Sequence, residues 1–194
     1  MEGVLSLDDV DLRGRTVLYR IDANSPMEPS TGNLLDDGRL RAVVETVMQL
    51  RESRVVLLSH QSRPGKSDFT STEPHCERLS EILGLPIRFV PDLCGEEAME
   101  EISNLSDGEI IFLDNVRKNH EEYGTKYSSN EMTESTEIVS RLSQLSDAYV
   151  TDAFAAAHRR SPTLTGFTKS IPCIAGSLME REISSLRLAL NDPP

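Results

Sequence analysis

Short apolar runs alternate along this chain with longer stretches whose apolar residues recur at helical spacing. Four of the runs are four or five residues long, and each ends in polar residues. They occupy positions 17–21, 55–58, 110–113 and 148–151, and two weaker runs lie at 86–90 and 171–174. Mainly apolar runs of this length are typical of strands that are buried on both faces of a parallel sheet. The alternation therefore restricts the chain to the α/β class.

The stretches between the runs predict helices. One helix begins near Asp36 or Asp37, and its apolar face at i, i+3, i+4 and i+7 consists of Leu40, Val43, Val44, Val47 and Leu50. Further helices are expected at 72–84, 95–105 and around 138–145, whereas the polar, acidic stretch 121–134 is expected to be a mobile loop. A last helix carries an apolar stripe of Met179, Ile183, Leu186 and Leu190. We expect a three-layer α/β/α Rossmann-like domain with a mostly parallel six-stranded sheet.

The polar residues that follow the runs include several cationic side chains. In an open α/β sheet the carboxyl ends of parallel strands line one edge, and ligands bind in the crevice there. We therefore expect this edge to gather His60, Arg63, Arg117, His158 and Arg159. The formal charge of the whole chain is −12. A cationic cluster within such an acidic protein indicates a small, highly charged anion as ligand, such as a phosphorylated acid.

The overall charge balance argues against two classes of partner. The chain has 20 Lys and Arg residues against 32 Asp and Glu residues, whereas general nucleic-acid binding needs a net basic surface. The same balance argues against docking on anionic membranes. No basic and apolar leader is recognisable, and the apolar runs are far shorter than the roughly 20 residues that span a bilayer. We expect a cytoplasmic protein that binds neither nucleic acid nor membrane.

Three further polar residues stand out as candidates for ligand binding. Arg39 is expected in the first turn of a helix, where a cation opposes the helix dipole at a cost of about 0.3–1 kcal/mol. This indicates either a functional role or an ion pair with Asp36 or Asp37. Asp22 and Asn24 follow the first apolar run, where they could recognise a hydroxyl group or form a turn.

The remaining histidines and cysteines give no metal-site signal. His75 and His120 lie in polar surroundings and are expected on the surface. Cys76, Cys94 and Cys173 are odd in number and show no metal-ligand spacing, so buried, reduced thiols are expected. The sequence therefore predicts no metal site in this chain.

Two other phosphate-related interpretations are weak. Residues 65–67 resemble the end of a P-loop, but the first glycine of that motif would fall on His60. Asp22 after a strand, with Ser59 at a second strand end, resembles an aspartate-dependent phosphatase. That chemistry needs a second acid two residues later, and this position is Asn24.

Six ordered motifs resemble the phosphoglycerate kinase family, in its archaeal form and in its N-terminal, substrate-binding half. They are RIDANSP at 20–26, DDGRL at 36–40, SHQSRP at 59–64, LDNVR at 113–117, DAFAAAHR at 152–159 and GSLMERE at 176–182. Many members of the family have a second histidine just after the His-Arg pair, and here Ser161 occupies that position.

The resemblance implies a site and a reaction. It implies that 3-phosphoglycerate is held by Asp22, Asn24, Arg39, His60, Arg63, Arg117 and Arg159. Asp22 and Asn24 would face the hydroxyl and carboxyl end of the substrate, and Arg39 would lie nearest the transferring phosphoryl group as the catalytic residue. The family transfers a phosphoryl group between ATP and 3-phosphoglycerate, giving 1,3-bisphosphoglycerate and ADP, and glycolysis runs the reaction in reverse.

The resemblance also implies a domain organisation. Residues 1–176 would form the 3-phosphoglycerate-binding domain, and residues 177–194 the linker helix toward a C-terminal domain that these residues do not include. Mg-ATP or Mg-ADP would bind to that missing domain, so no cofactor is expected in this chain. The chain alone is expected to bind 3-phosphoglycerate but to be inactive. The alternative is a free-standing module for phosphorylated acids that has no nucleotide domain.

Overall fold

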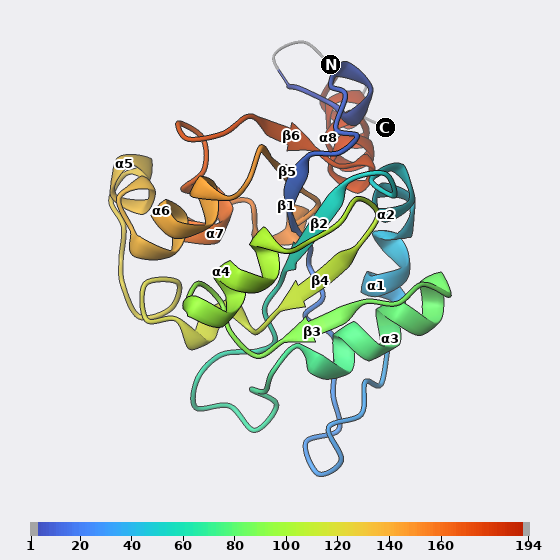
Figure 1. Cartoon of the computed structure of the whole chain (residues 1–194), viewed down its shortest axis with the longest axis vertical. Helices are drawn as coiled ribbons and strands as arrows, with labels where there is room; N and C mark the ends of the chain where they lie inside the picture. The colour runs from blue at the N-terminus through green and yellow to red at the C-terminus, as the bar shows by residue number, and fades with distance from the viewer. Residues whose placement is uncertain (1–3, 192–194) are drawn as a thin grey trace.

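Six strands form one sheet in which every neighbouring pair is parallel, in the order β3-β4-β2-β1-β5-β6. The computed structural model (Figure 1) describes residues 4–191. The strands are β1 (Thr16–Arg20), β2 (Arg54–Leu58), β3 (Arg88–Val90), β4 (Ile110–Leu113), β5 (Ala148–Thr151) and β6 (Cys173–Ala175). All six strands predicted from the apolar runs are confirmed, and the predicted sheet is fully rather than mostly parallel.

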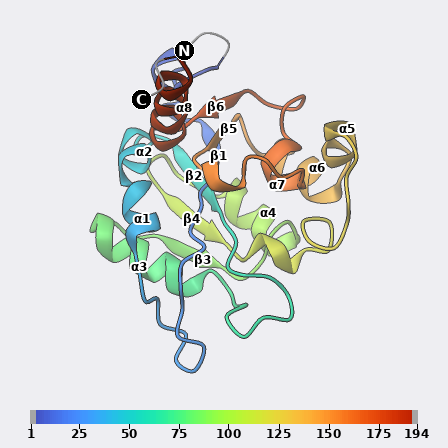
Figure 2. The ribbon, with the colours of Figure 1, turned by 180° about the vertical axis from the view of Figure 1, so that it is seen from behind.

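Helices cover both faces of this sheet. They are α1 (Gly38–Ala42), α2 (Val44–Gln49), α3 (Glu73–Leu83), α4 (Glu96–Ser103), α5 (Asn130–Glu134), α6 (Glu137–Gln144), α7 (Pro162–Thr165) and α8 (Ser177–Asn191), with short 3-10 turns η1 (Leu7–Asp9), η2 (Val116–Lys118) and η3 (Phe154–Ala156). Helices α1, α2 and α3 lie on one side of the sheet, and α4 and α6 lie on the other (Figures 1 and 2). The expected three-layer α/β/α Rossmann-like architecture is confirmed.

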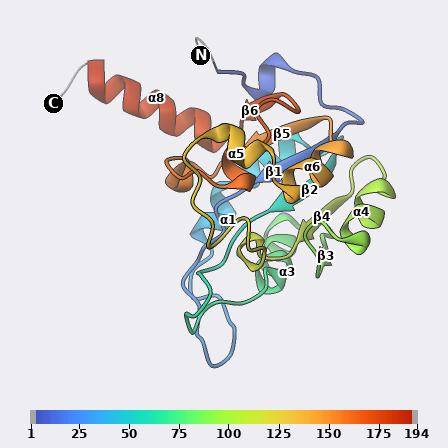
Figure 3. The same cartoon turned by 90° about the vertical axis from the view of Figure 1, so that its left-hand side faces the viewer.

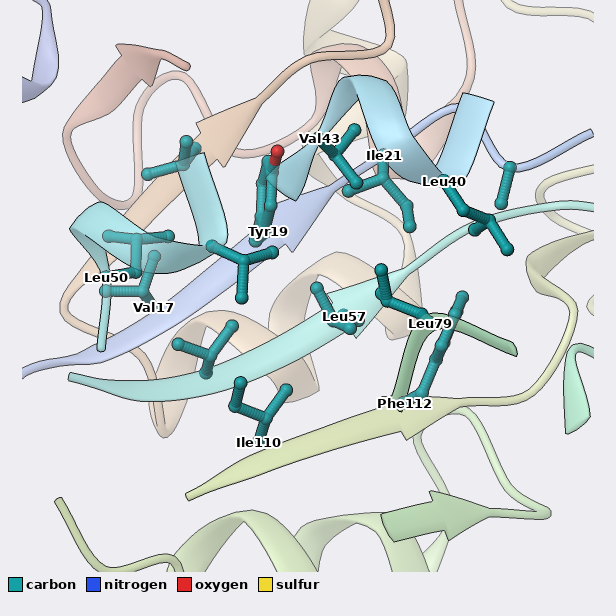
Figure 4. Packing of buried hydrophobic residues seen from close by; sticks show 14 of the residues in the cluster. Val17, Tyr19, Ile21, Leu40, Val43, Leu50, Leu57, Leu79, Ile110 and Phe112 are labelled. Carbon is teal, nitrogen blue, oxygen red and sulfur yellow. The ribbon is translucent and has the colours of Figure 1, made fainter. Parts of the chain in front are cut away.

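The two faces of the sheet carry separate apolar cores. Because successive side chains of a strand point to opposite faces, Val17 and Tyr19 of β1 enter one core, and Leu18 enters the other. Figure 4 shows the first core, where Leu40 and Val43 pack over the sheet. Burial of each such side chain contributes about 1.5–3 kcal/mol. A sheet that is covered on both faces explains why the strands read as uninterrupted apolar runs.

The first predicted helix is interrupted. Val43 has a φ of −96° and a ψ of −3°, and it separates α1 from α2. Val44, which was expected on the inner face, is only half-buried, whereas the polar Thr46 is fully buried. Its hydroxyl donates to Asp152 Oδ2 over 2.7 Å and accepts from the Ser177 amide over 2.9 Å. These hydrogen bonds explain why a polar side chain occupies a core position.

Asp152 joins the end of β5 to the beginning of α8. Its carboxylate is buried and accepts hydrogen bonds from Tyr19 Oη at 2.5 Å, Thr46 Oγ1 at 2.7 Å and the Met179 amide at 2.8 Å. A Cβ atom at Gly176 would lie 2.4 Å from Asp152 Oδ1, so only glycine fits there. This carboxylate therefore connects β1, α2 and α8 in one buried network.

Two predictions for polar residues need correction. The stretch 121–134, expected as a loop, is a loop at 121–129 but ends in α5, whose Thr133 is buried. The Glu121 carboxylate accepts from the amides of Glu137 and Ile138, which anchors the stretch to the start of α6. His75, expected on the surface, is fully buried in α3, where its Nε2 lies 3.0 Å from Gln61 Oε1. These polar side chains find partners that lie far away in the sequence.

The three thiols are free, as expected, but only Cys76 is fully buried, and Cys94 and Cys173 are half-buried. Burial raises the pKa of the Cys76 thiol to about 12 and those of the Cys94 and Cys173 thiols to about 11. Within residues 4–191 no group of three or more His, Cys, Asp or Glu side chains could hold a metal ion. In the same part of the chain no helix is long and apolar enough to cross a membrane.

The last helix leaves the sheet soon after it begins. Met179 is buried and Ile183 is half-buried, but Leu186, Leu188 and Leu190 are 52%, 72% and 81% exposed. Figure 3 shows α8 projecting away from the rest of the fold. The predicted apolar stripe therefore packs only at its beginning. The predicted ranges are 1–176 and 177–194. Of these, residues 1–3 and 192–194 lie outside the residues that the structure describes.

Candidate functional site

The cationic residues lie at the carboxyl edge of the sheet, beyond the ends of β1, β2, β4 and β5. The loops that follow β1 and β2 extend from the same end of the molecule (Figure 1). Three hollows lie along this edge, and each is named here after one residue. The His60 hollow and the Arg63 hollow have volumes of about 290 Å³ each and share Arg117, Tyr123 and Arg159. The Arg39 hollow has a volume of about 190 Å³.

Arg20 lines the His60 hollow and was not among the site residues predicted from the sequence. Its side chain is 1% exposed, and its Nη1 donates to the carbonyls of Ile21 at 2.8 Å and Leu58 at 3.2 Å. Its Nε has no partner in the described part of the chain. Burial lowers the pKa of this guanidinium. An arginine at the end of an apolar strand was the available signal, because charged side chains are rarely buried without a partner.

His60 is a neutral donor rather than the expected cation. Burial lowers the pKa of its imidazole to about 2, and the charges of Arg20, Arg117 and Arg159 act in the same direction. Its Nδ1 lies 3.2 Å from Arg20 Nη2. Because a guanidinium only donates, Nδ1 accepts and the ring proton resides on Nε2. The side chain can therefore offer one N–H group to a ligand oxygen.

Arg117 and Arg159 line both the His60 hollow and the Arg63 hollow, and Arg63 lines the second hollow only. Arg117 is half-buried, donates to the Ser62 carbonyl, and has its guanidinium carbon 5.9 Å from the centre of the Tyr123 ring. Burial, followed by repulsion from Arg159 and Arg20, lowers its pKa. Among residues 4–191, no carboxylate or hydrogen-bond partner is found for the guanidinium groups of Arg63 and Arg159. The edge thus offers cations that are free to bind an anion.

Asn24 and Ser62 shape the loop that carries Arg63. Asn24 Oδ1 accepts from the Ser62 amide at 2.7 Å, and Asp22 Oδ1 accepts from the Asn24 amide at 3.2 Å. Ser62 has a φ of 52°, in the left-handed region that non-glycine residues rarely adopt. The turn-forming alternative is therefore realised by Asp22, whereas Asn24 holds the distant loop of Ser62 and also lines the Arg63 hollow.

Asp22 and Arg39 line the third hollow together with Phe154, Leu178 and Glu182. The Arg39 guanidinium forms an ion pair with the Asp22 carboxylate. Asp37, considered as a partner of Arg39, instead binds Arg41 at 2.8 Å and Arg78 at 2.6 Å. The structure therefore brings these two predicted residues together, but in a hollow of their own.

His158 lies beside the cluster. It lines an open hollow with Lys126, Tyr127 and Arg160, and two of these cations, Lys126 and Arg160, also line the His60 hollow. The 3-10 turn η3 ends just before it, so the chain turns outward and His158 is exposed, whereas the next residue, Arg159, lines the shared hollows. His158 is therefore a neighbour of the other cations but does not line the two joined hollows.

The buried histidines predict a loss of stability in mild acid. Burial lowers the pKa of His75 to about 4 and that of His60 to about 2, against about 6.5 in an unfolded chain. Stability from these groups is therefore complete above about pH 6.5 and falls as the pH drops toward the folded values, because the unfolded chain binds the protons. Each histidine contributes a slope of up to about 1.4 kcal/mol per pH unit.

Urea unfolding between pH 7 and pH 4.5 measures this slope. His75→Gln should reduce the slope by up to about 1.4 kcal/mol per pH unit. An identical slope in wild type and His75→Gln would show that His75 is not a neutral, buried group.

Comparisons with known proteins identify the family and the fold. The sequence profile of the family described as Phosphoglycerate kinase matches residues 7–194. The phosphoglycerate kinase of Methanothermobacter thermautotrophicus is 48% identical over 189 residues, which are 96% of this chain and 46% of that protein. The crystal structure of the enzyme from Pyrococcus horikoshii OT3 superimposes with a TM-score of 0.94 at 39% identity, over 98% of this chain and 47% of the other. The Coxiella burnetii structure gives 0.77 at 30% identity. The chain spans about half the length of the curated relatives that it matches.

Proposed function

Because this chain belongs to the phosphoglycerate kinase family, we propose that its cationic sheet edge binds 3-phosphoglycerate for phosphoryl transfer. The observation that carries the proposal is the gathering of Arg20, Arg63, Arg117 and Arg159 around two joined hollows. A phosphate ester that also bears a carboxylate has two anionic ends, and guanidinium groups bind both kinds of oxygen strongly. The neutral His60 adds a directional N–H group.

The proposed roles follow the positions of the side chains. Arg63, Arg117 and Arg159 neutralise the anionic groups, and His60 donates from Nε2. Asp22 and Asn24 recognise the hydroxyl and carboxyl end. Arg39, whose guanidinium pairs with Asp22 in the free protein, is proposed to neutralise the transferring phosphoryl group.

In the proposed reaction, a carboxylate oxygen of 3-phosphoglycerate bonds to the γ-phosphorus of MgATP while the bond from that phosphorus to the β-phosphate oxygen breaks. The products are 1,3-bisphosphoglycerate and ADP. Since two anions must meet, the chain's contribution is positioning and charge neutralisation. Mg²⁺ would stabilise charge on the nucleotide, and no described group of side chains could hold it. We propose that the nucleotide binds to the half of a family member that this chain does not match.

The proposal extends to organisation and setting. Residues 1–176 are proposed as the substrate domain and residues 177–194 as the helix that leads to the nucleotide-binding half, because α8 leaves the sheet with exposed leucines. The identity with the Methanothermobacter enzyme supports an archaeal type. The metabolic role of the family supports a cytoplasmic location.

Isothermal titration of the 194-residue chain with 3-phosphoglycerate tests the proposal. Binding should be measurable at low salt and should weaken as salt shortens the Debye length from about 30 Å at 0.01 M to about 8 Å at 0.15 M. Glycerate, which lacks the phosphate, should bind at least about tenfold more weakly, because it loses at least one charge-assisted contact. Equal binding of the two compounds, or affinity that is independent of salt, would contradict the proposal.

A further inference from the structure

The geometry points to Glu122 as a positioning residue that holds together the two walls of the His60 hollow. This inference rests on the proposed function, since it concerns the same anion site. Glu122 supplies the carboxylate of this hollow, whose cationic lining consists of Arg20, Arg117, Lys126, Arg159 and Arg160. A negative charge within an anion site calls for an explanation.

The contacts of Glu122 reach across the hollow. Its Oε1 accepts from Ser161 Oγ and Thr163 Oγ1, both at 2.8 Å, and its Oε2 accepts from the Thr163 amide at 2.9 Å. Ser161 precedes α7 but makes no capping hydrogen bond with its own side chain. Glu122 thus satisfies a free amide at the start of α7, where a carboxylate is electrostatically favoured.

The two sides that Glu122 connects come from separate parts of the sheet. Arg117 and Tyr123 lie on the segment that follows β4, and Arg159 and Thr163 lie on the segment that follows β5. In the sheet, β2 and β1 separate β4 from β5. The distance between the cations of the two segments is therefore not set by direct strand pairing. The three hydrogen bonds of Glu122 join the segments beside the cations that they carry.

Electrostatics and positioning predict opposite effects of removing Glu122. The charge of Glu122 attracts the neighbouring guanidinium groups, so it competes with an anionic ligand for Arg20 and Arg117. If Glu122 acted only through its charge, removing it would strengthen anion binding. If it holds the walls in place, removing it weakens binding, because the arginines must then be ordered when the ligand binds.

The experiment compares three variants by isothermal titration with 3-phosphoglycerate. Glu122→Ala should weaken binding about tenfold. Glu122→Gln keeps an acceptor oxygen and loses the competing charge, so it should bind at least as tightly as wild type. The matched control is Glu121→Ala, which makes the same change in charge and also removes a carboxylate from a helix start, that of α6. It should bind within about twofold of wild type.

Urea unfolding of each variant separates this role from a purely structural one. Glu122→Ala and Glu121→Ala should lose similar stability, and only the first should lose affinity. Where Glu122→Ala fails to fold, Thr163→Val removes one donor to Oε1 and should weaken binding about threefold. Affinity in Glu122→Ala that equals or exceeds that of wild type, or an equal loss in Glu121→Ala, would overturn the inference.

A second titration with inorganic sulfate distinguishes this inference from the proposed function. Should wild type bind sulfate but not 3-phosphoglycerate, and the variants keep the expected order with sulfate, the proposed function fails and the role of Glu122 stands. Should wild type bind neither anion, both are wrong.

Discussion

Replacing Asp152 by alanine should lower the free energy of unfolding of this chain by about 3–5 kcal/mol. The carboxylate is buried and accepts from three donors: the Tyr19 hydroxyl, the Thr46 hydroxyl and the Met179 amide. Burial, and then the charge of Asp152, raise the pKa of Tyr19 well above its ordinary value, so the phenol remains a donor. Each donor that loses its acceptor within the protein costs about 1–3 kcal/mol.

Urea unfolding followed by circular dichroism measures the loss. Asp152→Asn keeps one acceptor oxygen and should fall between wild type and Asp152→Ala. Asp147→Ala is the matched control, because this half-exposed carboxylate accepts from the Thr16 amide at 2.8 Å and should cost about 1 kcal/mol. If Asp152→Ala lost no more stability than Asp147→Ala, the buried network would not be a major source of stability.

Replacing Arg159 by alanine should weaken 3-phosphoglycerate binding about 10- to 100-fold. Its guanidinium has no hydrogen-bond partner in the described part of the chain and lines both joined hollows. A hydrogen bond to a charged group contributes about 1.5–3 kcal/mol, which corresponds to this range. Arg63→Ala should have an effect of the same order, because Arg63 is equally free. Stability should change little in either variant, since no internal contact of these guanidinium groups is lost.

Arg51→Ala provides the control for net charge. Arg51 is exposed and lies between α2 and β2, at the opposite edge of the sheet. Arg51→Ala should bind 3-phosphoglycerate with an affinity within about twofold of wild type. Arg159→Lys should fall between wild type and Arg159→Ala, because lysine keeps the charge but not the planar fork of donors. An equal loss in Arg51→Ala and Arg159→Ala would show that binding reflects net charge rather than this site.

The sheet could be predicted from the sequence because burial on both faces leaves a local signature. The uninterrupted apolar run of β4 identifies a strand without any knowledge of its neighbours. The interruption at Val43 and the burial of Thr46 could not be predicted. The burial of Thr46 depends on Asp152, which lies 106 positions away from Thr46.

Most residues of the candidate site could be predicted from the sequence, but their protonation states and their grouping into hollows could not. The motifs identified His60, but its neutral form depends on burial and on arginines from other strands, which a sequence does not order in space. Arg20 was not recognised because it lies within an apolar run, between Tyr19 and Ile21. The segregation of Asp22 and Arg39 into a third hollow depends on the direction in which each loop leaves the sheet.

The central place of β1 in the sheet has a consequence for synthesis on the ribosome. β1 is among the first strands made, yet one of its two neighbours is β5, and 131 positions separate Thr16 from its partner Asp147. At about 5–20 residues per second, one edge of β1 therefore waits roughly 7–26 s for its neighbour to emerge. During that time a mainly apolar strand has an open edge, which favours aggregation. The nascent chain therefore has an interval in which chaperone capture competes with misfolding.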